Sequence, residues 1–299
     1  MGSIPKQPQV ARGHDHDHVA HRGRTEPTLS IATQTIPCCA TVYQAILKNH
    51  LECLKHLCNT DPHHYYEYIR IAAKMNRLDM VRYLHSKGYP WDVYTSQQAV
   101  QSGHLEILKY LHENNCPVDD MICDVAAREG HVEIIQYLHQ LHFPWDEVCC
   151  QEAAKKGHLH VLRYLHENGC PFDEMTFIHA AQAGSLKVIE YLHNHGCPWG
   201  KSACQGAIDF GHLDVLKYLH KHVRLNNPIF CITAAANGHI HILHYLHESG
   251  CPWNESACYA AANAGHFECL VYLHEHGCPW NEHANRIASY SGHYQCHLY

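Results

Sequence analysis

The sequence has no run of about 18 consecutive apolar residues, so no segment of it is expected to cross a membrane as a helix. It also has no block of basic residues. Its 22 lysines and arginines stand against 29 acids, giving a formal net charge of −7. An electrostatic attraction to nucleic acid is therefore not indicated. No signal-peptide core is found near the N-terminus, and we expect an intracellular protein.

Motifs of catalysis are also missing. The sequence shows no Gly-rich phosphate loop, no nucleophile elbow and no paired-carboxylate motif. Cysteine and histidine are abundant, but most of them recur on a regular lattice, so their presence alone predicts no nucleophilic pair. We therefore expect a protein without enzyme activity and without a bound cofactor.

Full disulfide pairing is excluded as well. The chain has 17 cysteines, and an odd number cannot be paired completely within one chain. Because nothing in the sequence indicates secretion, we expect free thiols in a reducing compartment.

What the sequence does contain is one phrase that returns every 27 residues. It reads Gly-His-Leu-x-x-Leu-x-Tyr-Leu-His, followed by glycine, cysteine, proline, tryptophan and an acid or amide. A fixed period of this size predicts a stacked array of repeats. Without insertion or deletion, the phrase begins at Asn49, Asn76, Gly103, Gly130, Gly157, Gly184, Gly211, Gly238, Gly265 and Gly292.

Residues 157–183 illustrate one unit. Residues 159–168 place apolar side chains at the spacing of an amphipathic helix. Gly169 suits the left-handed position that ends a helix, and Pro171 prevents its continuation. Asp173 suits the N-cap of a further helix. Each unit is therefore predicted as helix, short turn, helix and short loop.

The other copies support this assignment where the backbone is most demanding. Eight units hold a residue type in the N-cap slot that favours this position: Asp92, Asp119, Asp146, Asp173, Gly200, Asn227, Asn254 and Asn281. Paired alanines on the capped helix predict a close approach of neighbouring helices: Ala72/Ala73, Ala126/Ala127, Ala153/Ala154, Ala180/Ala181, Ala234/Ala235 and Ala261/Ala262. The unit that starts at Gly211 lacks Cys-Pro-Trp, and we expect a local irregularity there.

The phrase resembles the ankyrin repeat. Residues 103–109, Gly-His-Leu-Glu-Ile-Leu-Lys, are similar to the start of the second helix in that family. The family's usual period is 33 residues, with Thr-Pro-Leu-His opening the first helix. This chain has a shorter period and no Thr-Pro-Leu-His. The resemblance therefore implies an all-α solenoid of stacked helix-turn-helix, ankyrin-like repeats with reduced β-turn fingers.

The short unit, as in residues 164–172, resembles the ankyrin repeats of giant DNA viruses of amoebae. This resemblance implies a non-catalytic scaffold or adaptor that binds a protein partner in the host cytoplasm. We also expect the protein to be a monomer. We expect an array of about ten units over residues 36–299, behind a disordered, histidine-containing tail of residues 1–35. The run His14–His18 in that tail is expected to be a solvated polar segment, with loose metal binding as the alternative.

Histidine and cysteine lie four residues apart in five units, and both are zinc ligand types. Other units hold Tyr89, Phe143 and Arg224 in the first cysteine slot, and Phe177 fills the second. A slot that accepts phenylalanine indicates apolar packing, so we expect no metal on this lattice. A metal- or redox-responsive scaffold is the alternative function. The five pairs are His112/Cys116, His166/Cys170, His193/Cys197, His247/Cys251 and His274/Cys278.

Two histidine ladders follow the repeat. At the start of each second helix, a histidine is expected to tie neighbouring units together. At the end of that helix, a histidine suits the helix dipole and the loop backbone. A pH-sensitive stack is the alternative for this second ladder, which comprises His85, His112, His139, His166, His193, His220, His247 and His274.

Partner-binding residues are predicted on the first helix of each unit. Residues two, six and nine positions after the N-cap point away from the core and differ between units. A row of exposed apolar side chains along a concave surface is typical of an interaction site, although packing against a neighbouring helix is the alternative. The candidates are Tyr94, Gln98, Met121, Val125, Val148, Glu152, Met175, His179 and Ile229.

Overall fold

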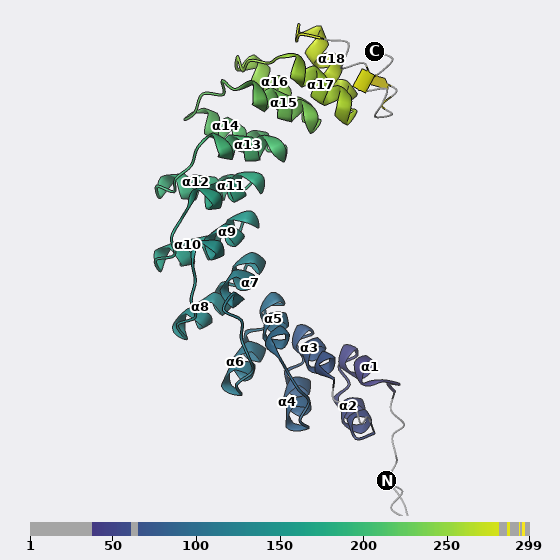
Figure 1. Cartoon of the computed structure of the whole chain (residues 1–299). Coiled ribbons are helices and arrows are strands. Elements are labelled where there is room, and N and C mark those ends of the chain that lie inside the picture. The colour runs from purple at the N-terminus through teal and green to yellow at the C-terminus, as the bar shows by residue number, and fades with distance from the viewer. Residues whose placement is uncertain (1–37, 61–64, 281–285, 288–292, 294, 297–299) are drawn as a thin grey trace, which may run out of the picture. The chain divides into compact units, whose positions relative to one another are not determined.

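Figure 1 shows a computed structural model of the chain. The chain divides into two units, Met1–Ile36 and Pro37–Tyr299. The structure describes residues 38–60, 65–280, 286–287, 293 and 295–296 of the second unit. The expected disordered tail with its histidine run, the Asn281 cap and most of the tenth repeat lie outside these described residues.

The described residues contain eighteen α-helices and no strand, which confirms the all-α solenoid. None of these helices is both long and apolar enough to cross a membrane. The first helices of the units are α1 Val42–Leu47, α3 Tyr66–Lys74, α5 Val93–Gln101, α7 Ile122–Glu129, α9 Glu147–Lys155, α11 Glu174–Gln182, α13 Lys201–Asp209, α15 Pro228–Ala236 and α17 Glu255–Ala264. The second helices are α2 Leu51–Cys58, α4 Leu78–Ser86, α6 Leu105–Glu113, α8 Val132–Gln140, α10 Leu159–Glu167, α12 Leu186–Asn194, α14 Leu213–His220, α16 Ile240–Glu248 and α18 Phe267–Glu275.

The helices form two rows, one of first helices and one of second helices (Figure 1). Neighbouring first helices, such as α9 and α11, contact each other more extensively than neighbouring second helices, such as α8 and α10. The paired alanines explain this difference, because all of them are fully buried and bring little volume between the helices. The close approach predicted from these alanines is therefore confirmed.

The N-caps are confirmed for six of the predicted positions. The Asp173 carboxylate, for example, accepts a hydrogen bond from the Thr176 backbone N–H at 2.8 Å. Asp119 was predicted wrongly, because α7 begins only at Ile122. In the turn before α7, the Ile122 N–H donates a hydrogen bond to the Asp119 carbonyl. The Asp119 side chain accepts a hydrogen bond from the Met121 backbone N–H.

Left-handed residues end the helices as the spacing predicts. The opening residue of every copy from Asn49 to Gly265 has positive φ and follows a first helix. At the position that follows each second helix, Asn115 and His142 adopt positive φ where most other units have glycine. Side chains are disfavoured in this region of backbone space, which is why glycine dominates both slots.

The unit that starts at Gly211 is irregular, as expected. Its second helix, α14, ends at His220, and Val223 does not adopt positive φ. Arg224 occupies the usual cysteine slot but is exposed, while Leu225 is only 4% exposed. The loop is therefore shifted by one residue, because only Leu225 offers an apolar side chain for the buried site.

Candidate protein-binding face and the inter-repeat ladders

The nine candidate residues all belong to the first helices or to their N-terminal turns. We call this surface the first-helix face. Tyr94, Met121, Met175 and Ile229 are exposed, with 56%, 61%, 44% and 42% of their surface accessible. Val148 was expected to be exposed but is half-buried. The remaining candidates are also half-buried: Gln98, Val125, Glu152 and His179.

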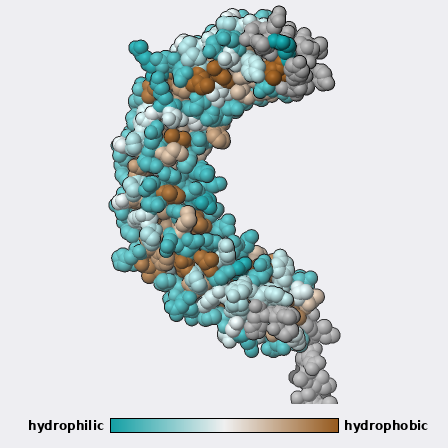
Figure 2. Space-filling view, viewed as in Figure 1, coloured by the Kyte–Doolittle hydropathy of each residue, from teal (hydrophilic) through white to brown (hydrophobic). Residues whose placement is uncertain are grey.

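Exposed large apolar side chains concentrate on the first-helix row. Among the described residues, eleven of the twelve belong to first helices or the turns at their ends, and Leu141 alone belongs to the second-helix row. In the view of Figure 2, apolar groups form small, separate patches on a mostly hydrophilic surface. The apolar side chains are therefore distributed unequally between the two rows. The eleven are Tyr43, Leu47, Tyr65, Tyr66, Met75, Tyr94, Met121, Met175, Phe210, Ile229 and Tyr259.

A groove of about 440 Å³ crosses α1, α3 and α5. Tyr43, Leu47 and Met75 line it together with the candidates Tyr94 and Gln98. The groove thus brings exposed apolar side chains from three consecutive units into one hollow, which is the geometry that a partner side chain needs.

An ion pair fixes the wall of this groove. The Arg70 guanidinium donates two hydrogen bonds to the Asp92 carboxylate, one of them from Nε at 3.0 Å. Burial alone would raise the pKa of Asp92, but the hydrogen bonds and charge of Arg70 outweigh it and hold that pKa below its ordinary value. Arg70 also lies 5.0 Å from the Tyr94 ring centroid, so the exposed tyrosine rests on a fixed cation.

A second groove, of about 390 Å³, combines apolar and acidic side chains. Met121 and Val148 line it beside the carboxylates of Asp120, Asp124 and Asp146. Burial raises the pKa of Asp124, whose Oδ1 atom accepts a hydrogen bond from the Cys149 thiol at 3.0 Å. No basic side chain lines this groove, so it favours a basic partner group.

Further along the row, Glu152 accepts a hydrogen bond from the Arg128 guanidinium at 2.6 Å. His179 lies in the next unit, and burial lowers its pKa. Ile229 lines a third hollow, of about 310 Å³. The second-helix row is also hollowed, by grooves of about 500 and 560 Å³ that share Leu159 and the charged residues Arg163, Glu167 and Lys187.

The ladder at the end of the second helices joins neighbouring units through tyrosine. The His166 Nδ1 atom lies 3.0 Å from the Tyr191 hydroxyl of the following unit. Loop backbone was the expected partner, and the tyrosine was missed because it lies 25 residues away in sequence. Burial raises the pKa of Tyr191, so its hydroxyl remains a donor. The same bond joins His85–Tyr110, His139–Tyr164, His193–Tyr218, His220–Tyr245 and His247–Tyr272.

This ladder predicts loss of stability in mild acid. Burial lowers the pKa of His85, His166, His193 and His247. Above the ordinary histidine pKa of about 6.5, both the folded and the unfolded chain hold these side chains neutral. Below about 6.5, the unfolded chain binds more protons, so the free energy of unfolding decreases as the pH falls. We expect the melting temperature to decrease between about pH 7 and pH 5.5.

The control replaces the same four histidines with glutamine, which keeps a polar side chain that does not titrate. The variant should lose part of the pH dependence measured by thermal melting. A wild-type melting temperature that stays constant over this range would contradict the prediction.

The other ladder confirms the expected tie between units. The His212 Nε2 atom donates to the Gln182 carbonyl, in the last turn of the preceding unit's first helix, at 2.8 Å. The imidazole also lies directly over Gly184, where an added Cβ would come within 2.4 Å of Nδ1. This contact explains why glycine and histidine recur together, since the histidine of one unit covers the glycine of the unit before it. Equivalent bonds join His104–Lys74, His131–Gln101, His158–Arg128, His239–Asp209 and His293–Asn263.

The cysteine lattice is a set of buried packing residues. In the first slot, the Cys170 thiol donates to the carbonyl of Asp146 in the preceding unit, at 3.0 Å. Burial raises the pKa of Cys197 and Cys123 to about 12 and that of Cys204 to about 11. Because the thiolate is the reactive and metal-binding form, these three thiols are poorly suited to redox or metal chemistry. The pKa of Cys251 and of Cys278 is instead lowered, because each thiol accepts a hydrogen bond from a neighbouring lattice cysteine, Cys231 or Cys258.

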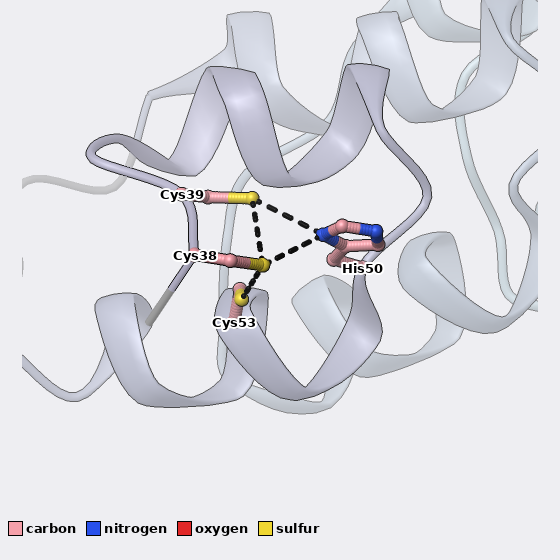
Figure 3. A group of neighbouring side chains, drawn as sticks. All are labelled: Cys38, Cys39, His50 and Cys53. Carbon is pink, nitrogen blue, oxygen red and sulfur yellow. Dashed lines mark hydrogen bonds between the residues drawn. The ribbon is translucent and has the colours of Figure 1, made fainter. Parts of the chain in front are cut away.

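One group of cysteine and histidine lies outside this lattice. Cys38 and Cys39 precede α1, while His50 and Cys53 belong to the start of α2. Their ligand atoms all lie within 4.8 Å of one another, and Figure 3 shows the four side chains pointing toward each other. It is the sole group of three or more potential metal ligands found among the described residues.

Models of protein families match more than half of the chain. Ankyrin repeats in many copies match residues 69–112, 96–139 and 123–166, and ankyrin repeats in three copies match residues 150–228. Together they span residues 69–228, or 160 of 299 residues. The chain belongs to the ankyrin-repeat family. Ankyrin repeats are generally protein–protein interaction modules, and proteins built from them are typically non-enzymatic scaffolds.

A solved structure agrees with this ankyrin fold. The ankyrin repeat domain of human ASB11 matches with a TM-score of 0.50 and 18% sequence identity, covering 59% of this chain and 96% of that domain. At this identity the likeness shows the fold alone. No curated protein matches the chain.

The ankyrin pattern accounts for the lattice but not for the Cys38 group. In the repeat pattern, the histidine at the end of a second helix and the cysteine after that helix are four residues apart. His50 and Cys53 are three apart, and their partners come from the preceding segment. The sequence signal for this site is the pair Cys38-Cys39, which stands at the N-cap slot where most later units have aspartate or asparagine.

Proposed function

We propose that this ankyrin array is a non-catalytic scaffold or adaptor that binds a protein partner on the first-helix face. The unequal distribution of exposed apolar side chains carries this proposal. Tyr94, Met121, Met175 and Ile229 recur at one position of the repeat, and between 42% and 61% of their surface stays exposed within the array. Aromatic and methionine side chains of this kind anchor protein interfaces when a partner covers them.

The chemistry of the grooves supports a particular kind of partner segment. The groove beside Met121 is lined by apolar side chains together with two exposed carboxylates, Asp120 and Asp146, and the buried carboxyl of Asp124. A segment with apolar side chains next to lysine or arginine complements this surface in both respects. In the first groove Arg70 is ion-paired, and Glu67 and Lys74 add one charge of each sign. That groove therefore has no charge preference and suits an apolar or aromatic side chain.

We further propose that the protein acts as a monomer, without catalysis, in the cytoplasm of a host cell. The support is the resemblance of its 27-residue unit to the ankyrin repeats of giant viruses of amoebae, together with seventeen free cysteines, which suit a reducing compartment. Light scattering during gel filtration tests the monomer, and imaging of tagged protein in an amoeba tests the location.

Affinity capture from amoeba lysate tests the binding face. The test variant carries Tyr94→Asp, Met121→Asp and Met175→Asp, which place charge at the centre of the proposed interface. The control carries Gln136→Asp, Leu141→Asp and Asn194→Asp, three exposed positions on the second-helix row with the same change in net charge. Circular dichroism melting establishes that both variants are folded.

We expect a protein that is retained by wild type and by the control but reduced at least about tenfold with the test variant, since interface centres contribute on the order of 2 kcal/mol per anchor. Equal recovery with both variants would remove the first-helix face from the proposal. Loss with the control alone would move the site to the second-helix row.

A further inference from the structure

The Cys38 group has the composition and the spacing of a metal site. The Cys38 Sγ atom lies 2.9 Å from His50 Nδ1, 3.1 Å from Cys53 Sγ and 3.9 Å from Cys39 Sγ. The Cys39 Sγ atom lies 3.5 Å from the same His50 nitrogen. Three sulfurs and one imidazole nitrogen form a Cys3His set, one of the ligand sets of structural zinc.

The size of the group also fits zinc. Zinc–sulfur bonds of about 2.3 Å and zinc–nitrogen bonds of about 2.0–2.1 Å place tetrahedral ligand atoms roughly 3.5–3.8 Å apart. The four separations given above run from 2.9 to 3.9 Å, and all four ligand atoms lie within 4.8 Å of one another, so small side-chain movements are enough to seat the ion. Cys38 and His50 are exposed, which gives an ion access from solvent, while Cys39 is only 1% exposed.

The position of His50 in the repeat explains why it is available. His104 and His212 occupy the same slot in later units and donate Nε2–H to a carbonyl thirty residues earlier. No described unit precedes α1 and α2, so His50 has no such carbonyl among the described residues. Its Nδ1 atom meets Cys38 and Cys39 instead.

The first helix of this unit is adapted in the same way. Cys38 stands in the slot where Asp92 and Asp146 cap the first helices of later units. Here α1 begins only at Val42, with Thr41 as its N-cap. The three-residue delay leaves Cys38 and Cys39 in the segment before the helix, where both sulfurs face the start of α2 (Figure 3).

We propose that Cys38, Cys39, His50 and Cys53 bind one zinc ion, which fastens the segment before α1 onto α2 and closes this end of the array. Binding replaces the protons of the three thiols, and these protons pass to the solvent. The site is structural because all four positions are filled by protein ligands. Its role is independent of the partner-binding face and of the lattice cysteines.

Metal titration of the full-length protein, reduced with a phosphine, tests this proposal. Cobalt(II) is the probe, because thiolate ligation gives a charge-transfer band in the near ultraviolet and tetrahedral geometry gives intense visible absorption. Zinc is then added to displace the cobalt, and elemental analysis gives the stoichiometry. Histidines of residues 1–35 cannot produce the thiolate band, so that band distinguishes cysteine ligation from metal binding by those histidines.

Two pairs of matched variants locate the ion. Cys53→Ser removes a proposed ligand, and Cys269→Ser removes the cysteine of the same repeat slot eight units later. His50→Asn and His104→Asn form the corresponding histidine pair. We expect one equivalent of metal with the thiolate band in wild type, Cys269→Ser and His104→Asn. In Cys53→Ser and His50→Asn, we expect the band to be lost or the affinity to fall by at least about tenfold.

Hydrogen exchange adds a second measurement that depends on the ion but not on colour. Zinc should slow exchange of amides in residues 38–60 in wild type and in Cys269→Ser, and not in Cys53→Ser. Absence of the thiolate band in wild type, or its persistence in Cys53→Ser and His50→Asn, would overturn the proposal. A Cys38–Cys53 disulfide found by mass spectrometry in protein purified from the cytosol without oxidant would overturn it as well.

Discussion

Replacing Phe177 with alanine should lower the free energy of unfolding by about 3–5 kcal/mol. The Phe177 side chain is fully buried in α11, and its ring stacks on Trp199 of the next unit at 5.1 Å between centroids and 11° between planes. Truncation leaves a cavity at the contact between two units, so it removes packing within one unit and across the interface. Urea denaturation followed by circular dichroism measures the loss.

The same slot provides a control for this cavity. Cys204 occupies it in the following unit and is also fully buried. Cys204→Ala removes one sulfur atom, and we expect a loss of about 1 kcal/mol. Because stability in an array propagates through neighbours, Phe177→Ala should also broaden the transition as the two halves begin to unfold separately. Equal effects of the two substitutions would show that the ring is not held as the structure describes.

Replacing Gly184 with alanine should lower the free energy of unfolding by about 3 kcal/mol or more, whereas Gly169→Ala should lower it by about 1–2 kcal/mol. Both glycines adopt positive φ, +67° and +88°, so an alanine at either position carries the same kind of backbone strain. They differ in their surroundings. A Cβ on Gly184 would come within 2.4 Å of His212 Nδ1, whereas a Cβ on Gly169 has nothing within 4 Å.

The additional loss at Gly184 comes from the ladder. The new methyl group displaces the His212 imidazole, which then loses its hydrogen bond to the Gln182 carbonyl. A double-mutant cycle with His212→Ala separates the two contributions, since removing the imidazole leaves the methyl group nothing to displace. We expect Gly184→Ala to cost about 1–2 kcal/mol in that background, similar to Gly169→Ala. Additive losses in the cycle would contradict the contact.

The fold could be predicted from sequence because the start and end of each helix depend on nearby residues in the chain. The positive-φ slots, the caps such as Asp173 and the paired alanines depend on neighbours within a few residues, and the period repeats them until no other assignment fits. Asp119 shows the limit of such rules. Its residue type suits an N-cap, but its carboxylate accepts a hydrogen bond from the Met121 backbone N–H, and the helix begins only at Ile122.

Contacts between units were harder to predict from sequence. Tyr191 lies 25 residues after His166 and the Gln182 carbonyl lies 30 residues before His212. These separations follow from the way neighbouring units stack. The 27-residue period predicts that the units stack, but it does not show which side chains meet. The sequence therefore predicts that the histidines at the start of the second helices join units. For the histidines at the helix ends it predicts only a bond to loop backbone, and it does not reveal the tyrosine partner.

For the candidate sites too, local properties could be predicted from sequence, whereas contacts between distant residues could not. Helical periodicity placed Tyr94 and Met121 on an outward face, because direction from a helix axis is a local property. It placed Val148 there too, yet contacts that the periodicity does not contain leave this side chain half-buried. The Cys38 group was missed for a related reason, since its ligands meet only after α1 begins late and brings the preceding segment beside His50.

Partner binding on the first-helix face is tested most directly by photo-crosslinking. A photoreactive amino acid replaces Met121 or Met175 in two proteins, and Gln136 on the second-helix row in a third. Each protein is irradiated in amoeba lysate. We predict one shared crosslinked protein from positions 121 and 175 and none from position 136. A crosslink from position 136 alone would contradict the binding face.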